Sequence, residues 1–496
     1  MKKIEKQHLK TMKSSIMEKK LNLNYKNILL VFFASQLIWG CKMGKNYEAP
    51  EIDTPLEYRF GSDTTISTNN DTIGWWTLIK DPVLDSLIST ALVNNQDVKV
   101  AMQRITEAEK LARIQKVSAR PMLGYQGNFT YGNYNGFVGP DANSSYFGGA
   151  TLNWEIDLWG KNRRLTEAAQ ANYFGSVYGM RALQITLISQ VTKAYVQLLE
   201  NKASLEVSIE TLASRDSSMI IMDARYKQGI IPEIDLNQAQ IQQAIAESTI
   251  PVYKRGVALS ENSLSILLGE NPRAIITDET LDTQVLPDAI PAGIPSDLLK
   301  RRPDLLKAEQ EIVAQNAQVG AAIANRFPTI SLTGAAGIAS DALFSANAAT
   351  GAWNIGAGIV GPLFQWGKNK RRVEAEKAKL EASILQYEKS TIVAFKEVED
   401  ALASIQFYNE ELIARQKHTV AALNAERLSK QRYDKGVTSY LEYLEQQRQA
   451  FEAELNLVSV RSKILSSYIL LYKSLGGGWV SREEQQEAEG NETENQ

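Results

Sequence analysis

The residue types that most often carry out catalysis or bind metals are scarce in this sequence. Two of its 496 residues are histidines, His8 and His418, and one is a cysteine, Cys41. A zinc site or a Cys–His nucleophile pair needs more such groups. The net charge of −3 does not provide the basic surface that nucleic acid requires. We therefore predict a protein that is not an enzyme and has no metal, no cofactor and no nucleic-acid partner.

The single cysteine follows a segment that is typical of an export signal. Lysines precede the apolar run Ile28–Trp39, which has 12 residues, whereas a membrane-spanning helix needs about 20. The run ends in Gly40 and Cys41, which resembles the processing site of a bacterial lipoprotein. We predict that residues 1–40 are a signal peptide and that Cys41 carries a covalent lipid such as palmitate. The alternative is an unmodified thiol.

Two glutamates, Glu442 and Glu445, are the other candidates for a functional site. Their spacing of three places both carboxylates on one face of a predicted helix. Neighbouring carboxylates raise each other's pKa and attract cations. Repeated by symmetry around a narrow axis, such carboxylates would favour the passage of cations, and the alternative is a solvated helix face.

The elements that position these residues occur twice in the chain. Trp159-Gly160-Lys161-Asn162 recurs as Trp366-Gly367-Lys368-Asn369, a shift of 366 − 159 = 207 residues. The same shift relates Asp97, Pro121, Tyr226 and Gly229 to Asp304, Pro328, Tyr433 and Gly436. A constant shift predicts two equivalent halves. The predicted division is 41–74 (extended, lipidated), 75–272 (first half), 273–294 (linker), 295–478 (second half) and 479–496 (acidic, disordered).

Each half is predicted to contain two strands after an opening helix. The strands are 122–132 and 146–158 in the first half, and 329–339 and 352–364 in the second. Apolar residues alternate with small or polar ones, so that each strand has one apolar face. This pattern is typical of a membrane β-barrel, and the alternative is a soluble sandwich.

A very long helix and a returning helix follow the strands in each half. We predict them at 161–228 and 233–268, then at 369–435 and 439–475, with Thr438 or Ser439 as N-cap of the last. Residues 369–435 contain neither Gly nor Pro, and 435 − 369 + 1 = 67 residues span roughly 100 Å as a helix. Their apolar residues recur at steps of three and four, which indicates a coiled-coil-like seam. A plain helical bundle would not explain the strands.

Four strands cannot close a barrel in a membrane. Open edges would leave backbone groups unpaired in lipid, and the smallest membrane barrels have about eight strands. The chain must therefore associate with further copies, and two, three or four copies are all possible. The long helices must lie outside the bilayer. A barrel continued by a helical tube is a conduit.

Several stretches resemble the TolC/OprM type of outer-membrane efflux factor, in particular its lipoprotein branch. They are "WWTLIKDPVLDSLISTAL" from Trp75, "LLGENP" from Leu267, "IPSDLLKRRPDLLKAEQEIVAQNAQVGAAIANRFPTISLTG" from Ile294 and "FKEVEDALA" from Phe395. The resemblance implies an α+β membrane protein. It would be a homotrimer with a 12-stranded β-barrel, four strands per chain, continued by a long periplasmic α-helical barrel with a mixed equatorial region.

The resemblance also implies a gate at the periplasmic tips of the helices. Leu441 matches an apolar constriction, and Glu442 and Glu445 match rings of acidic residues. Tyr433 matches a tyrosine that ties neighbouring coils together, and Asp235 is the first-half equivalent of Glu442. Thr438 replaces an arginine that some relatives have, so the tether made by that arginine is not expected.

Two further sets of residues have expected roles. The turn residues match the tips that adaptors grip, and the alternative is ordinary helix termination: Gly229, Ile230, Lys435, Gly436, Val437 and Thr438. The repeated phrase is expected to mark the junction of barrel and tube, with Trp at the membrane interface and Lys near headgroups: Trp159, Gly160, Lys161, Trp366, Gly367 and Lys368.

We therefore expect the lipid-anchored outer-membrane exit duct of a tripartite efflux system, extending into the periplasm of a diderm bacterium. Its implied partners are a periplasmic adaptor (membrane fusion) protein and an inner-membrane pump of the resistance–nodulation–division class. One alternative is the exit duct of a type I protein secretion system. A less favoured alternative is a periplasmic adaptor lipoprotein, which would have a single helical hairpin.

Overall fold

The computed structural model describes residues 42–61, 79–132, 143–284, 295, 298–340 and 350–477. These residues belong to two compact units. The first unit lies within Met1–Pro50, Glu107–Phe174 and Gln310–Leu385, and the second within Glu51–Thr106, Gly175–Glu309 and Gln386–Gln496. Each half of the sequence therefore contributes to both units.

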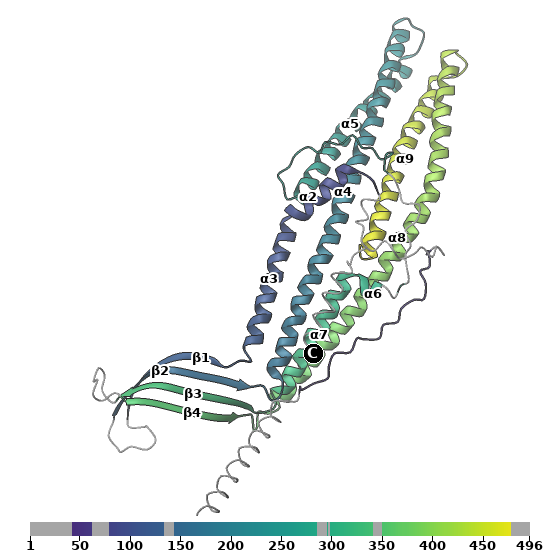
Figure 1. The fold of residues 1–496 in the computed structure, drawn as a ribbon. Helices are drawn as coiled ribbons and strands as arrows, with labels where there is room; N and C mark the ends of the chain where they lie inside the picture. The colour runs from purple at the N-terminus through teal and green to yellow at the C-terminus, as the bar shows by residue number, and fades with distance from the viewer. Residues whose placement is uncertain are drawn as a thin grey trace, which may run out of the picture. The chain divides into compact units, whose positions relative to one another are not determined.

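The first unit contains a four-stranded sheet with the order β1-β2-β3-β4 (Figure 1). The strands are β1 (Met122–Gly132), β2 (Asn143–Ile156), β3 (Thr329–Ser340) and β4 (Thr350–Val360). Every neighbouring pair is antiparallel. The sheet thus joins one hairpin from each half of the sequence through the pairing of β2 with β3.

The second strand of each hairpin ends earlier than predicted. Strands were expected to continue to residues 158 and 364, whereas β2 ends at Ile156 and β4 at Val360. Ile156 pairs with Ile330 and Val360 with Thr329, which are the first residues of β3. The alternation of apolar residues continues past these points, but the partner strand does not, so the ladder ends there.

One face of the sheet carries most of its large apolar side chains, whereas Met122, Phe147 and Val360 lie on the other. The register places Leu123 opposite Leu152 and Phe129 opposite Tyr146, whose rings stack with centroids 4.8 Å apart. The strongly exposed members of this face are Leu123, Tyr125, Phe129, Tyr131, Ile338, Trp353, Ile355 and Ile359. The other face carries small and polar residues, including Gln126, Asn128, Thr151, Asn153, Ser331 and Thr333. The apolar residues predicted to share a face do so in all four strands, and Phe147 of β2 is an exception to the alternation.

Helices of the first half are α2 (Pro82–Asn94), α3 (Gln96–Val117), α4 (Lys161–Lys227) and α5 (Glu233–Leu267). Those of the second half are α6 (Leu298–Arg301), α7 (Pro303–Ala324), α8 (Lys368–Asp434) and α9 (Tyr440–Ser474). The helices α4 and α8 have 67 residues each, and α5 and α9 have 35 each. Their first residues differ by 368 − 161 = 207 and 440 − 233 = 207.

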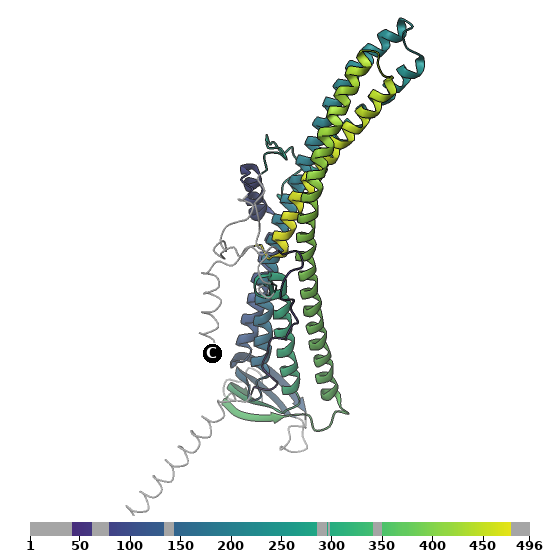
Figure 2. The same cartoon turned by 90° about the vertical axis from the view of Figure 1, so that its right-hand side faces the viewer.

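The second unit is held together by a core in which α2, α4, α5 and α9 meet. Its buried members include Leu84, Tyr195, Leu198, Leu264 and Leu465. Figure 2 shows that α4 with α5 and α8 with α9 form two helical hairpins. Within the part of the chain that the structure describes, no helix is both long and apolar enough to cross a membrane.

The two halves use equivalent positions to tie down their returning helices. Asn95 Nδ2 donates to the backbone oxygen of Leu267 at 2.9 Å, and Arg302 Nη1 donates to that of Ser474 at 3.1 Å. Both donors differ by 302 − 95 = 207 and both acceptors by 474 − 267 = 207. An amide in one half and a guanidinium in the other thus make the equivalent hydrogen bond. Both can do so because the acceptor is a backbone carbonyl at a helix C-terminus, which has no partner within the helix.

Candidate functional site

The candidate site at the helix tips begins with two turns of the same design. Gly229 and Gly436 have φ values of +70° and +71° and end α4 and α8. The amide of Ile230 donates to the Arg225 oxygen, and that of Val437 to the Arg432 oxygen, both at 2.9 Å. Such bonds satisfy the last carbonyls of a helix. Ile230 and Val437 remain 64% and 66% exposed, so each turn presents one apolar side chain to its surroundings.

Next to these turns lies a buried group of residues, here called the tip cluster. It consists of Met222, Leu236, Ala239, Tyr440, Tyr443 and Leu444. Tyr433 of α8 packs against it, and its hydroxyl donates to Met222 Sδ of α4 at 3.1 Å. The Arg225 guanidinium lies 4.9 Å from the centre of the Tyr433 ring. Tyr433 therefore connects the two helical hairpins within the chain.

Glu442 lies in the first turn of α9 and is held on two sides. Its carboxylate accepts a hydrogen bond from the Thr438 hydroxyl and lies 3.3 Å from Arg432 Nη1. Ser439 is the N-cap of α9, but its side chain makes no capping bond. Thr438 therefore binds the helix through the Glu442 side chain, and Arg432, which the sequence analysis missed, supplies the cation at this place.

Glu445 is also partnered. Arg448 Nη2 donates to it at 2.8 Å and Arg448 Nε at 3.1 Å, and Gln449 Nε2 donates at 2.8 Å. The hydrogen bonds from Arg448, and then that from Gln449, lower the pKa of Glu445 to about 2. This is the opposite of the rise expected from carboxylates alone. Arg448 lies three residues after Glu445, so the spacing rule for helices could have found it.

The two remaining predicted gate residues differ in exposure. Leu441 is 58% exposed and is not a member of the tip cluster. Asp235 is half-buried in the first turn of α5, where an acidic side chain interacts favourably with the helix dipole. Burial first, and then the nearby tyrosines, raise the pKa of Tyr440 to about 12. The Tyr440 phenol therefore stays protonated.

A buried arginine further along α4 was not predicted. Arg215 is 3% exposed, donates to the Gln242 backbone oxygen at 2.6 Å and stacks 5.2 Å from the centre of the Phe451 ring. Burial lowers its pKa. Among the described residues no acceptor pairs with its Nε and Nη2 atoms. The sequence offered no signal that this arginine would be buried.

The predicted junction residues lie in the first unit, and its first copy is packed. Trp159 stacks on Phe327 with centroids 4.7 Å apart, and its Nε1 donates to the Pro328 oxygen at 2.7 Å. Gly160 has φ +72°, and Lys161 Nζ lies 2.7 Å from the Glu155 carboxylate. These contacts fasten the strand-to-helix turn within the chain.

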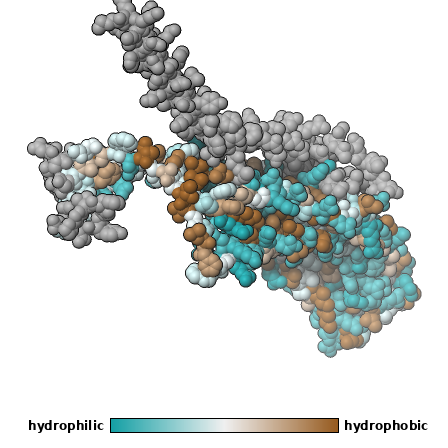
Figure 3. Space-filling model, turned by 90° about the horizontal axis from the view of Figure 1, so that it is seen from below, coloured by the Kyte–Doolittle hydropathy of each residue, from teal (hydrophilic) through white to brown (hydrophobic). Residues whose placement is uncertain are grey.

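The second copy of the phrase has few such contacts. Trp366 is 86% exposed and has φ +48°, an uncommon backbone conformation for a residue other than glycine. Gly367 has φ +79°, and Lys368 is exposed at the start of α8. Val360, Leu363 and Phe364 before it are also more than two-thirds exposed. Figure 3 shows hydrophobic residues gathered where the strands lead into the helices.

Some predicted features fall outside the described residues. They are Cys41, the signal peptide of residues 1–40, part of the extended segment and of the linker, and the tail 479–496. Within the described ranges, no group of three or more His, Cys, Asp or Glu residues could hold a metal ion.

Comparison with known proteins gives a consistent result. The family model described as "Outer membrane efflux protein" matches residues 87–270 and 294–477, which begin 294 − 87 = 207 residues apart. The chain is 33% identical over 470 residues to the antibiotic efflux pump outer membrane protein ArpC of Pseudomonas putida, covering 92% of this chain and 96% of that protein. It is 31% identical over 457 residues to the cation efflux system protein CusC of Escherichia coli, covering 91% and 98%. The solved outer-membrane channel OprN superimposes with a TM-score of 0.82 at 26% identity, covering 88% and 100%.

Proposed function

The chain belongs to the outer membrane efflux protein family, and from this premise we propose that it is the exit duct of a tripartite efflux system. It conducts substrates passively and is not an enzyme. The observation that carries this conclusion is the match of both halves to one family model, at 87–270 and at 294–477. An adaptor with a single hairpin does not have this organisation. The names of the relatives favour an efflux pump over a protein secretion system.

We propose that three copies form the duct. In the sheet, β1 pairs only with β2 and β4 only with β3, so among the described strands both outer edges are open. Lipid does not tolerate open edges. Three chains would supply 3 × 4 = 12 strands, with the apolar face toward lipid and the polar face toward the lumen.

The anchoring proposal concerns the lipid and the junction. Cys41 would carry the lipid that attaches the chain to the outer membrane. Trp366 is 86% exposed, which supports a role at the membrane interface, where tryptophan is favoured. Trp159 is engaged within the chain and would position the first strand-to-helix turn instead.

The tips of the helices would carry the gate and the docking site for partners. The partners are a periplasmic adaptor and an inner-membrane pump, since the relatives are named as components of efflux pumps and systems. The exposed turn residues Ile230 and Val437 support docking at the tips. Threefold symmetry would arrange Leu441, Glu442 and Glu445 around the axis, where carboxylates favour cations.

Planar-bilayer recordings test the gate. The double variant Glu442→Ala/Glu445→Ala should reduce the preference for cations, because a unit charge at 4 Å in water is worth about 1 kcal/mol, or roughly fivefold in cation occupancy. Glu374→Ala/Glu381→Ala, which removes two exposed glutamates of α8, is the control and should leave the preference unchanged. Equal ion preference in the wild type and the tip variant would remove the gate assignment.

A further inference from the structure

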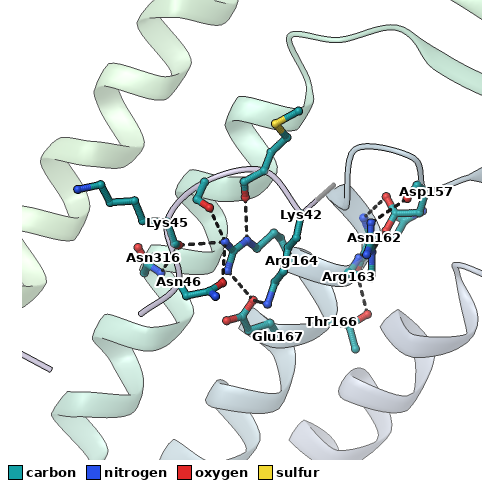
Figure 4. A network of polar contacts seen from close by, with 12 residues as sticks. Lys42, Lys45, Asn46, Asp157, Asn162, Arg163, Arg164, Thr166, Glu167 and Asn316 are labelled. Carbon is teal, nitrogen blue, oxygen red and sulfur yellow. Dashed lines mark hydrogen bonds and ion pairs between the residues drawn. The ribbon is translucent and has the colours of Figure 1, made fainter. Parts of the chain in front are cut away.

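We propose that Arg164 is the docking residue for Lys42–Asn46, here called the N-terminal segment, and that it thereby sets the position of the lipid anchor. The inference rests on the proposed lipid attachment at Cys41, the residue before this segment. Arg164 lies in the first turn of α4, and its side chain is fully buried, with 0% exposure. A buried guanidinium requires hydrogen-bond acceptors around it. Figure 4 shows that these come from the N-terminal segment and from Glu167.

The contacts of Arg164 are mostly to backbone oxygens. Its Nε donates to the Met43 oxygen at 2.9 Å, and its Nη2 donates to the Gly44 and Lys45 oxygens at 2.8 and 2.9 Å. Nη2 also lies 3.3 Å from Asn46 Oδ1. The fifth contact is from Nη1 to the Glu167 carboxylate at 2.9 Å. One side chain thus holds four consecutive residues of the segment.

This arrangement makes docking and burial of Arg164 a single event. Without the segment, Glu167 would be the only one of these five partners left, so the guanidinium would have to turn to solvent for its hydrogen bonds. Leaving buried charged donors unpaired is strongly unfavourable. The planar fork of arginine reaches several carbonyls at once, which the single ammonium of a lysine cannot do. Because backbone oxygens are recognised, docking depends on the path of the segment more than on its side chains.

Other residues of the first unit hold the same segment. Lys42 Nζ lies 2.8 Å from the Glu167 carboxylate, and Asn316 Nδ2 of α7 donates to the Lys45 oxygen at 3.2 Å (Figure 4). The Met43 amide donates to the Trp159 oxygen at 3.3 Å. The last contact links the segment directly to the turn between β2 and α4.

Two glycines allow the close approach. Gly44 has φ +85°, and a Cβ built on it would lie 2.9 Å from Gly320 Cα. A Cβ on Gly320 would lie 2.7 Å from Arg164 Nε and 2.8 Å from the Met43 oxygen. Such distances are too short for real Cβ atoms, so any side chain at Gly320 would push the guanidinium and the segment apart.

In the described part of the second half, the equivalent arginine does not hold such a segment. The equivalent of Arg164 is Arg371, since 164 + 207 = 371, and its side chain is 83% exposed and lies 3.5 Å from Glu374. The feature is therefore not a requirement of the strand-to-helix turn. The segment lies between the start of α4 and α7, and it contacts Arg164 of the first half and Asn316 of the second.

The consequence concerns the lipid. Cys41 precedes Met43 by 43 − 41 = 2 residues, so an extended chain tethers it within roughly 7 Å of the docked residue. A lipid on Cys41 would therefore be held close to the turn after β2, and no long flexible linker would separate the two. Arg164 would act as a positioning residue that keeps the lipid attachment point near the level of the membrane at which β2 ends.

Trypsin cleavage after Lys45 tests the dock in the full-length chain, solubilised in detergent after palmitate labelling in cells. The scissile carbonyl is the one that Arg164 and Asn316 hold, so docking should protect it. Cleavage is followed by mass spectrometry as the fragment beginning at Asn46, relative to cleavage after Lys435 in the α8–α9 turn. Arg164→Gln and Arg164→Lys should raise this ratio roughly tenfold or more, since each lost charged hydrogen bond is worth about tenfold. The control Arg371→Gln should not change it.

The outcomes separate the two proposals. Faster cleavage in the Arg164 variants with palmitate retained supports the dock, and unchanged cleavage overturns it. If Arg164→Gln does not accumulate as folded protein, Gly320→Ala and Asn316→Ala disturb the segment from α7 with Arg164 intact, against the helix control Gly179→Ala. Protection equal to wild type in both would again overturn the dock. A wild-type chain without palmitate refutes lipid attachment, while the cleavage ratios still decide the role of Arg164.

Discussion

Single residues at the helix tips show how much a carboxylate depends on its neighbours. Glu445 and Glu442 each have an arginine close by, Arg448 and Arg432, so neither is an isolated negative charge in the chain. The hydrogen bonds of Arg448 keep Glu445 ionised well below its ordinary pKa of 4.5. A ring built from Glu445 would keep its charge in mild acid, although Arg448 also weakens the field of that ring.

The pKa of Glu445 leads to a prediction about pH. Because its pKa is lowered to about 2, the charge is present above that pH and is lost only as the pH falls through about 2. In a Glu442→Gln background, Arg448→Gln should move the midpoint up toward 4.5. Cation preference in planar bilayers, recorded from neutral to acid pH, measures the midpoint. Identical midpoints with and without Arg448→Gln would contradict the role given to this arginine.

At the scale of elements, the same short motif packs differently in the two halves of the chain. The helices of the two halves have the same lengths and the same turns, but the two WGK phrases differ. Trp159 is packed on Phe327, whereas Trp366 is 86% exposed. Likewise Arg164 is buried and Arg371 is 83% exposed. The repeat therefore gives both halves the same long helices. The contacts of equivalent side chains differ because different segments pack against them.

The turns at the tips give a prediction about stability. Gly436 has φ +71° and no atom within 4 Å of a built Cβ, so a substitution there meets backbone strain only. Gly436→Ala should cost about 1 kcal/mol, because a side chain is disfavoured in the left-handed region. Gly436→Asn should cost less, since asparagine tolerates that region. Thermal unfolding of the purified chain measures the effect.

The control for this prediction is Gly351→Ala in β4. Gly351 also has open space around a built Cβ but does not have a left-handed φ. If Gly436→Ala and Gly351→Ala lower the unfolding temperature equally, the strain at the tip turn is not the cause.

At the scale of the whole molecule, the proposed barrel needs more strands than one chain supplies. Its sheet has four strands, an apolar face and open outer edges among the described residues. Pairing β1 of one copy with β4 of the next would satisfy both edges by one repeated contact. This is a heterologous contact, and it forms a ring if the rotation closes.

Chemical crosslinking of the purified chain in detergent tests the copy number. We expect products of one, two and three chains, with the three-chain product increasing at the expense of the others as the reagent concentration rises. Dilution before crosslinking controls for chance collisions. A product that stays at two chains, or one that proceeds to four, would contradict the 12-stranded barrel.

The sequence alone determined the elements and the family. Strand alternation, the long run without Gly or Pro and the shift of 207 residues are local or periodic signals, and they placed β1 at the residues where it lies and the long helices within one residue. They could also locate the turns, because Gly229 and Gly436 must adopt a left-handed φ. Such features depend on backbone geometry, which neighbouring residues control.

Only the tertiary structure decided which side chains meet. Nothing in the sequence indicated that Arg164 would hold the segment at Met43, 164 − 43 = 121 residues earlier, or that Tyr433 would reach Met222, 433 − 222 = 211 residues earlier. The sequence also did not indicate that Trp159 would be packed and Trp366 exposed. The burial and partners of these side chains depend on contacts between distant parts of the chain. Periodicity within a segment shows which face is apolar, but it does not show which other segment packs against that face.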